Sequence, residues 1–342
     1  MGKGDMGTDR LALLNVFLHK AGWDQADQQP LSGDASFRRY IRLDFNGKAA
    51  LVMDAPPSHE DVRPFVQVDK HLRLLDFSAP EILFEDEDNG FLLLEDFGHN
   101  TFTNLLAGGG SERNLYQLAT DVLIALHAIE SDTAAPEWLP PYDDGRLRDE
   151  AALLLDWFMP ASGLEVTTEA RADYERIWYS LFAHVHAGQR TLVLRDYHVD
   201  NLMRLDGRTG LKACGLLDFQ DALAGHPAYD VMSLLQDARR DIDENLEAHL
   251  LDHYCDALDL RGTDRDNFEQ AYAILAAQRH AKVIGIFTRL DRRDGKPIYL
   301  KHITRVWRLL ERALLHPDLA DMKVWIDSHI PADKRTASET SP

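Results

Sequence analysis

The sequence predicts an α+β fold with a small, β-rich N-terminal lobe and a large, mainly helical C-terminal lobe. The chain has 342 residues, which is too long for one simple core and suits two lobes. Two turn signals in the first hundred residues, Asn46-Gly47 and Asp88-Asn89-Gly90, lie between apolar runs and are typical of β-hairpins. After Gly98 the apolar residues recur mainly at helical spacing. Strands do not alternate with helices throughout, so a doubly wound sheet and a barrel are excluded.

The first lobe is expected to span residues 1–97, with a hinge near 95–98. Helical spacing of apolar residues predicts two helices in it, at 9–20 and 59–75. Its strands are expected at 37–43, 49–54, 81–85 and 91–95.

The second lobe is expected to span residues 98–330. A short buried strand at 191–194 leads into a polar segment, and a hairpin over the turn Asp206-Gly207 follows, with strands at 202–205 and 213–217. Its helices are expected at 112–129, 146–158, 168–187, 228–240, 243–258, 265–290 and 298–315. The remaining residues, 331–342, are rich in Ser, Thr and charged residues and are expected to be a disordered tail.

The composition excludes several classes of partner. The formal net charge is −20 at pH 7, which argues against nucleic acid and against an anionic membrane surface. No run of 18 apolar residues is present, so we expect no membrane span. Cys214 and Cys255 form no CxxC pair and no zinc spacing, which suits a reduced, cytoplasmic protein.

The polar segment after the 191–194 strand has the residues needed for metal-assisted chemistry. Asp196 precedes Asn201 by five residues, and Asp218 ends the next hairpin, followed by Phe219. This spacing is typical of kinase catalytic loops, in which the first carboxylate faces the substrate and the other two residues hold a metal. Carboxylate and amide oxygens suit magnesium. The alternative interpretation is that these three residues only cap turns.

The first lobe carries weaker signals for nucleotide binding. The segment Ser32-Gly33-Asp34-Ala35-Ser36 lies between two apolar elements, so Gly33, Asp34 and Ser36 are candidates for a turn that covers phosphates, or they form an ordinary turn. No GxxxxGK[ST] pattern occurs, which excludes a P-loop. The run Leu92 to Asp96, with Glu95 in it, could pair its backbone with adenine or could be an ordinary buried strand.

The C-terminal half of the chain has one basic stretch. Arg279, Lys282, Arg289 and Arg293 share one face of a predicted helix, which indicates either a solvated face or a grip on an anionic substrate group. Arg289 and Arg293 are our candidate substrate contacts. Asp221 either lines the substrate site or caps a turn.

Several stretches resemble the aminoglycoside phosphotransferase-like kinases, which share the bilobal protein-kinase-like fold. More closely, they resemble bacterial anomeric kinases of N-acetylmuramate and N-acetylglucosamine that act in cell-wall recycling. The matching stretches are 32–40, 52–57, 91–98, 195–203, 217–222 and 285–290.

This resemblance implies an ATP- and Mg²⁺-dependent enzyme whose small-molecule partners are ATP and an amino sugar. It implies that Asp196 positions or deprotonates the C1 hydroxyl, that Asn201 and Asp218 hold magnesium, and that the α-1-phosphate product feeds UDP-N-acetylmuramate. The chain departs from the protein-kinase pattern at three places: Leu194 replaces a His, Gln220 replaces a Gly, and no Lys lies within the 49–54 strand. The phosphate contact is therefore open between Arg38, Arg39 and Lys48, and Arg38 and Arg39 would point to opposite faces of a strand.

Two other functions remain open at this stage. The acidic net charge would favour a cationic acceptor, as in a kinase of an aminoglycoside or an amine alcohol. The missing strand lysine would suit a nucleotide-binding pseudokinase, although the complete set of Asp196, Asn201 and Asp218 argues against it.

Overall fold

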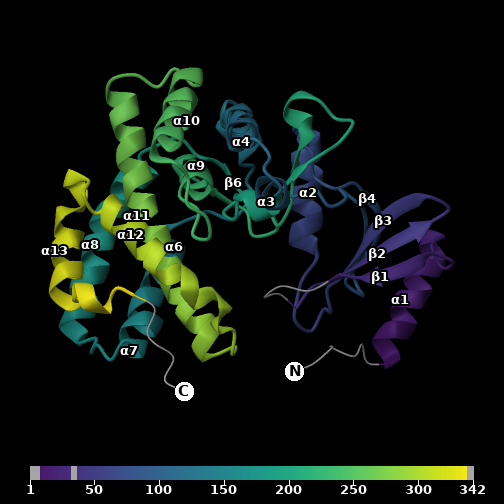
Figure 1. Ribbon diagram of the computed structural model, residues 1–342, viewed down its shortest axis with the longest axis horizontal. Coiled ribbons are helices and arrows are strands. Elements are labelled where there is room, and N and C mark those ends of the chain that lie inside the picture. Colours follow the sequence, from purple (N-terminus) through teal and green to yellow (C-terminus); the bar gives the residue numbers. More distant parts are fainter. Residues whose placement is uncertain (1–7, 32–36, 337–342) are drawn as a thin grey trace. The chain divides into compact units, whose positions relative to one another are not determined.

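The computed structural model describes residues 8–31 and 37–336, and the chain forms two compact units (Figure 1). The first unit comprises Met1–Gly110 and Val199–Asp221, and the second comprises Ser111–His198 and Ala222–Pro342. The predicted α+β class is confirmed, because the first unit holds a five-stranded sheet and the second is mainly helical.

The two units do not coincide with the predicted lobes. They differ mainly in the 199–221 segment, which was predicted in the second lobe but belongs to the first unit. Two isolated β-bridges join this segment to the rest of that unit: Gly215 pairs with Ser78, and Met203 pairs with Thr101. The lobe boundary at 95–98 stays a prediction.

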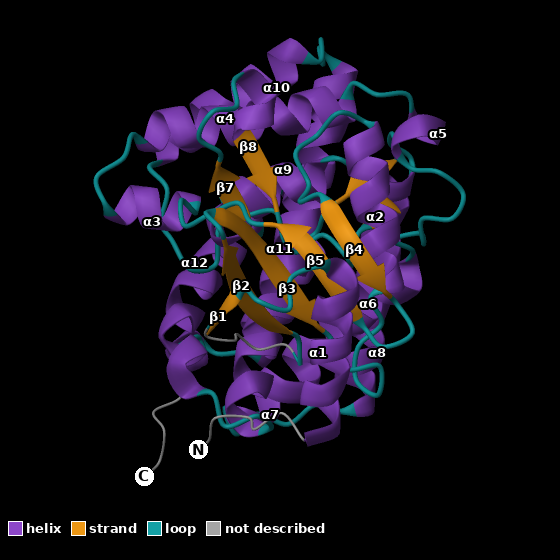
Figure 2. Ribbon diagram, turned by 90° about the vertical axis from the view of Figure 1, so that its right-hand side faces the viewer, coloured by secondary structure: helices purple, strands orange, loops and turns teal. Residues whose placement is uncertain are grey.

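The sheet of the first unit is antiparallel throughout, in the order β1-β2-β3-β5-β4 (Figure 2). Asn46 and Gly47 both have positive φ, 53° and 74°, which is what a two-residue turn between β2 and β3 requires. The elements of this unit are α1 (Thr8–Ala21), β1 (Asp27–Pro30), β2 (Arg39–Phe45), β3 (Lys48–Asp54), α2 (Arg63–Leu74), β4 (Ile82–Asp86), β5 (Phe91–Glu95), α3 (Phe102–Ala107), β7 (Leu202–Arg204) and β8 (Cys214–Leu216).

Helix α1 closes one face of this sheet. Its buried residues Leu14, Phe17 and Leu18 join a cluster with the inward-facing residues of β2, β3 and β5. The Phe17 ring stacks on the Phe91 ring with centroids 5.3 Å apart. Burial of these side chains from both elements is the main favourable contribution to the packing of α1 on the sheet.

The second unit is built around the long helix α11. The elements of this unit are α4 (Glu112–His127), α5 (Ser131–Ala134), α6 (Asp144–Leu153), a π-helical turn (Leu154–Phe158), α7 (Met159–Ala161), α8 (Thr168–His186), β6 (Thr191–Val193), β9 (Leu223–Gly225), α9 (Ala228–Leu235), α10 (Glu244–Ala257), α11 (Thr263–Arg292), α12 (Ile303–Ala313) and α13 (Ala320–His329).

Gly285 lets α11 approach the end of α6 closely. A Cβ atom at Gly285 would lie 2.3 Å from the backbone carbon of Leu153, so no larger residue fits there without displacing the backbone. This approach fixes α6 against the C-terminal half of α11, and both helices supply side chains to the candidate site.

Several predicted segments differ from the structure. The helix predicted at 228–240 ends at Leu235, and the helix predicted at 298–315 begins as a 3₁₀ segment, Pro297–His302, which α12 continues from Ile303. The tail predicted to be disordered from 331 is described as far as 336: Ala332–Lys334 form a 3₁₀ turn, and Arg335 pairs with Glu311 at 2.8 Å and with Asp327 at 2.7 Å. Residues 337–342 lie outside the described residues.

Among residues 8–31 and 37–336, every helix is too short or too polar to span a lipid bilayer.

Candidate functional site

The Asp196 segment of the second unit is held by a buried carboxylate. β6 pairs with β9 in antiparallel register, and the chain then turns sharply at Arg195, whose φ is 67°. The Asp230 carboxylate, fully buried on α9, accepts hydrogen bonds from the backbone N–H groups of Leu194 at 2.6 Å and Arg195 at 2.9 Å. Burial raises the pKa of Asp230 to about 7, although these two hydrogen bonds lower it. These two contacts show that Asp230 braces the loop that carries Asp196.

The carboxylate of Glu150 on α6 pairs with two of the cations next to Asp196. Its carboxylate forms an ion pair with Arg195 and another with Lys282 of α11, the latter at 3.0 Å. The Tyr142 hydroxyl donates a hydrogen bond to the same carboxylate. Burial raises the pKa of Glu150, but the charges of Lys282 and Arg195 outweigh it, and the pKa lies below its ordinary value. Sequence reasoning missed Glu150, because no local spacing connects it to residues 45 and 132 positions away.

Asp196 is ionised at neutral pH. Asp196 is exposed as a residue, but the surrounding protein atoms partly desolvate its carboxylate, and this desolvation alone would raise its pKa. The positive charges of Lys282, Arg279 and Arg195 outweigh this effect and hold the pKa below its ordinary value. An ionised carboxylate supported in this way can accept a hydrogen bond, or a proton, from a hydroxyl group.

In the first unit, Asn201 and Asp218 lie together. The Asn201 Nδ2 donates to Asp218 Oδ2 at 3.4 Å, and the Gln220 Nε2 donates to Asp218 Oδ1 at 3.0 Å. Asp218 has a positive φ of 59° and is followed by Phe219, whose ring stacks on Phe65 of α2 at 4.8 Å. This stacking fixes the loop that carries Asp218.

The donor set of Asn201 and Asp218 suits magnesium. One carboxylate and one amide oxygen are hard ligands, and magnesium in proteins is commonly held by one or two carboxylates together with waters and phosphate oxygens. No group of three or more His, Cys, Asp or Glu side chains suited to a metal occurs within the described residues. The pair therefore fits an ion shared with a phosphate ligand and does not form an all-protein metal cage.

Of the predicted phosphate contacts, the structure brings Arg38 to the Asp218 loop. Its guanidinium lies 3.7 Å from Asp218 Oδ1 and 3.9 Å from Glu60 Oε2, and its side chain is only 12% exposed. Arg39 lies 3.7 Å from Asp54. Lys48 is exposed at the other end of the β2–β3 hairpin, so the structure does not bring it to Asp218.

Glu95 has internal partners in the first unit. Its backbone N–H donates to Glu81 at 2.8 Å, and its carboxylate pairs with Arg208 from the β7–β8 turn. A role for Glu95 in nucleotide binding stays a prediction, and its N–H group is already used within the sheet. Gly33, Asp34 and Ser36 lie outside the described residues.

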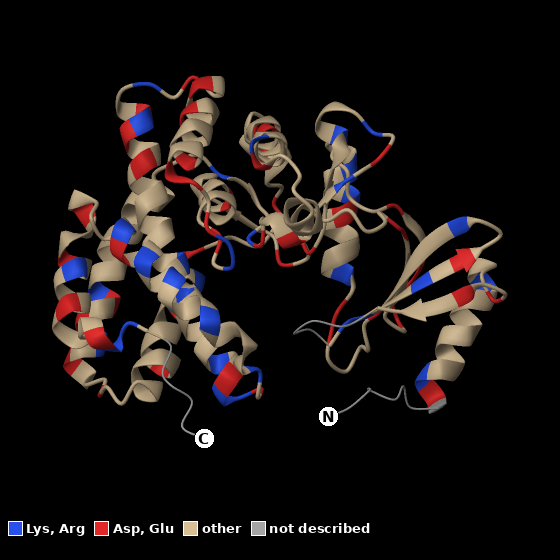
Figure 3. Cartoon of the chain, in the orientation of Figure 1, with Lys and Arg blue, Asp and Glu red and all other residues tan. Residues whose placement is uncertain are grey.

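The predicted substrate residues have different surroundings. Arg289 is partly buried on α11, and its Nε atom has no hydrogen-bond partner within 8–31 and 37–336. Arg293 is exposed just beyond α11 and pairs with Asp294 at 2.7 Å, and Asp221 is exposed. Figure 3 shows several basic positions along the C-terminal half of α11. Because Arg279 is buried and Lys282 mostly so, this face is not simply a solvated one.

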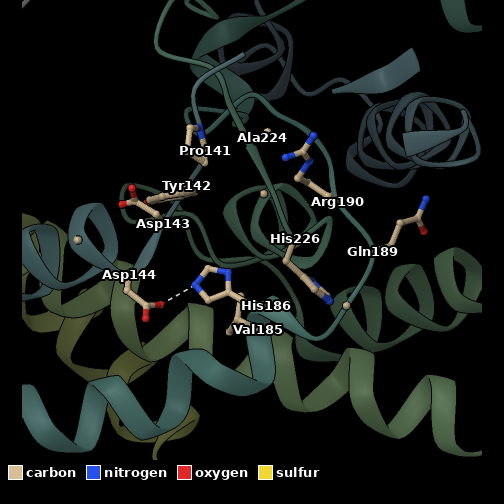
Figure 4. Close-up of a pocket in the computed structure, with 13 residues that line it drawn as sticks. Pro141, Tyr142, Asp143, Asp144, Val185, His186, Gln189, Arg190, Ala224 and His226 are labelled. Carbon is tan, nitrogen blue, oxygen red and sulfur yellow. Dashed lines mark hydrogen bonds and ion pairs between the residues drawn. The ribbon is translucent and has the colours of Figure 1, made fainter. Parts of the chain in front are cut away.

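A separate depression of about 590 Å³ lies in the second unit (Figure 4). Its lining residue Arg190 directly precedes β6, whereas Asp196 follows β6, so the depression lies at the opposite end of this strand. It lies beside His186, which pairs with Asp144 at 2.6 Å, and beside His226 and Arg190. None of the predicted site residues lines it, so it is not the candidate site.

Residues 27–269 match the model of the Phosphotransferase enzyme family. The chain is 33% identical to the N-acetylmuramate/N-acetylglucosamine kinase of Caulobacter vibrioides, over 96% of this chain and 99% of that one. It is 39% identical to the protein of the same name from Pseudomonas aeruginosa, over 88% of this chain and 89% of that one.

Among solved structures, the gentamicin complex of APH(2")-IIa aligns with a TM-score of 0.61 and 15% identity, over 90% of this chain and 99% of that one. At this identity the likeness is one of fold. The predicted protein-kinase-like fold and the predicted family resemblance are confirmed.

Proposed function

Because the chain belongs to the Phosphotransferase enzyme family, and is thus a kinase that transfers phosphate to a hydroxyl acceptor, we propose that its acceptor is an amino sugar. Specifically, it phosphorylates the anomeric C1 hydroxyl of N-acetylmuramate and N-acetylglucosamine and releases the α-1-phosphate. The observation that carries this proposal is the identity of 33–39%, over most of the chain, to relatives named for these two sugars.

Asp196 is the proposed catalytic residue. Its carboxylate is ionised at neutral pH because Lys282 and Arg279 lie near it, so it can orient the C1 hydroxyl and accept its proton. An anomeric hydroxyl is more acidic than an ordinary alcohol, so a carboxylate with a low pKa is an adequate base. Asp230 holds the backbone of the Asp196 loop, and Glu150 holds Lys282.

Asn201 and Asp218 are the proposed ligands of magnesium, and Arg38 is the proposed contact of the ATP phosphates. A magnesium ion there would neutralise phosphate charge during the transfer. The position of Arg38 supports this role, because the carboxylates of Glu60 and Asp218 hold its guanidinium from two sides. Contacts of ATP with Gly33, Asp34, Ser36, Lys48 and Glu95, and of the sugar with Asp221, Arg289 and Arg293, remain part of the proposal.

The product would supply peptidoglycan recycling toward UDP-N-acetylmuramate, in the cytoplasm. Within the part of the chain that the structure describes, neither Cys214 nor Cys255 forms a disulfide and both are buried, which suits a reducing compartment.

Phosphorus NMR tests the acceptor directly. The protein is incubated with ATP, Mg²⁺ and, separately, N-acetylmuramate, N-acetylglucosamine, kanamycin and choline. We expect a C1 phosphate signal for the two sugars, coupled to the anomeric proton of the α form, and none for the other two. A phosphate on kanamycin or choline alone would replace the sugar proposal with the cationic acceptor that the net charge of −20 would suit.

A further inference from the structure

The guanidinium of Arg279 is buried in the second unit without a partner among the described residues. Its residue is 4% exposed, its Nη1 atom has no hydrogen bond, and within 8–31 and 37–336 it takes part in no ion pair. An arginine side chain stays charged in proteins. A buried, unpaired charge is costly, so such a group is expected where a ligand of opposite charge completes the site.

The neighbouring anions of the protein are already engaged. The Asp230 carboxylate accepts the N–H groups of Leu194 and Arg195. The Glu150 carboxylate is shared between Arg195 and Lys282, so one anion serves two cations. Lys282 follows Arg279 by three residues on α11, which brings the two cations to adjacent positions on one helix face. The remaining carboxylate among the electrostatic neighbours of Arg279 and Lys282 is Asp196, the proposed catalytic group, so neither cation has a carboxylate of its own.

Arg279 and Lys282 lie far along α11 from Arg289 and Arg293, the two substrate contacts predicted from the sequence. Arg289 is ten residues beyond Arg279, which is about 15 Å along the helix axis at 1.5 Å per residue. Arg293 lies beyond the end of α11, exposed and paired with Asp294. A single sugar ring is shorter than that distance. An acidic group on a sugar whose C1 hydroxyl lies at Asp196 would therefore reach Arg279 and Lys282 first. Lys282 pairs with Glu150, Glu150 pairs with Arg195 next to Asp196, and Arg279 lies about one helical turn before Lys282.

Building on the proposed function, we propose that Arg279, assisted by Lys282, binds the carboxylate of an acidic amino sugar and so makes N-acetylmuramate a better acceptor than neutral N-acetylglucosamine. The planar fork of a guanidinium matches a carboxylate with two parallel hydrogen bonds, which a lysine cannot make. Arg279 is thus a specificity-determining residue, whereas Asp196 acts on the hydroxyl common to both sugars.

The first test compares kcat/KM for the two sugars in Arg279→Gln, Arg279→Lys and the matched control Arg265→Gln. Arg265 lies on the same helix and pairs at the surface with Glu269 and Asp252. We expect Arg279→Gln to lower the ratio of N-acetylmuramate to N-acetylglucosamine activity by about 100-fold, because an uncompensated carboxylate is costly to desolvate. Arg279→Lys should restore part of the ratio, and Arg265→Gln should leave it unchanged. An equal loss for both sugars would overturn the proposal in favour of a contact with the transferred phosphoryl group.

The second test measures anion binding without turnover. Melting temperatures are recorded without nucleotide, alone and with N-acetylmuramate, N-acetylglucosamine or D-lactate, which carries the carboxylate without the sugar. We expect N-acetylmuramate and D-lactate, each at about ten times its dissociation constant, to raise the melting temperature of the wild type and of Arg265→Gln by about 2 °C or more, and that of Arg279→Gln not at all. Without ligand, Arg279→Gln should melt no lower than the wild type, because the substitution removes an unpaired buried charge.

The two tests separate the inference from the function on which it rests. If the wild type phosphorylates neither sugar while D-lactate still stabilises it through Arg279, the proposed function fails and the anion site stands. If D-lactate shifts the wild type and Arg279→Gln equally, or shifts neither, the anion site is refuted whatever the sugar activity. A lower melting temperature of ligand-free Arg279→Gln and Arg279→Lys would assign Arg279 a structural role instead.

Discussion

The carboxylate of Asp230 accepts a hydrogen bond of 2.6 Å from the backbone N–H of Leu194, two residues before the proposed catalytic carboxylate. Leu194 stands where protein kinases have a histidine, and its side chain is buried. An apolar residue is tolerated at this position because the loop is held through its backbone. The geometry of the Asp196 segment therefore depends on a residue of α9 and not on the side chain that precedes Arg195.

We expect Asp230→Asn to lower both activity and stability. The amide offers one oxygen to the N–H groups of Leu194 and Arg195, so one of them loses its acceptor, and the free energy of unfolding should fall by about 1–3 kcal/mol. Loosening of the loop should reduce kcat more than it changes KM for ATP. Chemical denaturation and steady-state kinetics measure the two effects. Asp243→Asn, at the N-cap of α10, is the control, since Asn caps helices about as well as Asp. Equal, small effects of both substitutions would contradict the bracing role.

The sequence predicted most of this fold because its turns and periodicities are local. Asn46-Gly47 has the conformation expected of a tight hairpin, and the strands around it follow. β1 was missed, since Asp27-Gln28-Gln29-Pro30 has no apolar alternation and forms a strand only by pairing with β2. Tertiary pairing overrides weak local preference in such a segment.

The residues of the candidate site likewise fall into those that the sequence predicted and those that it missed. Asp196, Asn201 and Asp218 were predicted because their spacing is short and characteristic. Glu150 was not, because it meets Lys282 across 132 positions of sequence and nothing near it signals that contact. The basic face of α11 was recognised by helical spacing, but burial singles out Arg279, and burial of one helix position cannot be read from spacing alone.

Asp196→Asn should abolish catalysis but leave nucleotide binding nearly unchanged. The amide cannot accept a proton, so kcat should fall by about 10³-fold or more. ATP affinity, measured by equilibrium titration, should change less than about threefold, because the proposed phosphate and metal contacts lie on other residues. Asp206→Asn, at an exposed turn, serves as the control. Full activity of Asp196→Asn would remove Asp196 from its catalytic role.

Asp218→Asn should remove the magnesium dependence of nucleotide binding. Asn tolerates the positive φ of this position, so the backbone can keep its conformation while the charged ligand is lost. ATP titrations across a range of Mg²⁺ concentrations should show a rise in affinity for the wild type and a nearly flat response for the variant. A magnesium response identical to that of the wild type would contradict a metal role for Asp218.

Substitution of Arg38 should weaken ATP much more than adenosine. Arg38→Gln removes a mostly buried cation beside Asp218 and Glu60, and ATP affinity should fall by about tenfold or more, since hydrogen bonds to charged groups contribute about 1.5–3 kcal/mol. Adenosine carries no phosphate and should bind unchanged. The same measurement on Lys48→Gln decides between the two candidate phosphate contacts. A loss of ATP affinity in Lys48→Gln alone would reassign the contact to Lys48.

The buried carboxyl group of Asp69 should cause the free energy of unfolding to fall as pH rises. Its side chain is buried on α2, and neither carboxylate oxygen has a hydrogen-bond partner among the described residues. Burial raises the pKa of Asp69 from 3.8 to about 7. Between these two values the folded protein retains a proton that the unfolded chain releases, so the free energy of unfolding falls as pH rises through this window and is lowest above it.

Asp69→Asn removes this titration with little change in volume. At pH 5 the folded wild type is protonated at Asp69 while the unfolded chain is already ionised, so part of the stability is already lost. Between pH 5 and pH 8 the stability of the variant relative to the wild type should increase further, by about 2 kcal/mol. Asp230 titrates in the same range but is present in both proteins, so the difference between them isolates Asp69. Urea unfolding at pH 5 and pH 8 measures this difference, and a difference that does not change with pH would show that Asp69 is ionised in the folded protein at both.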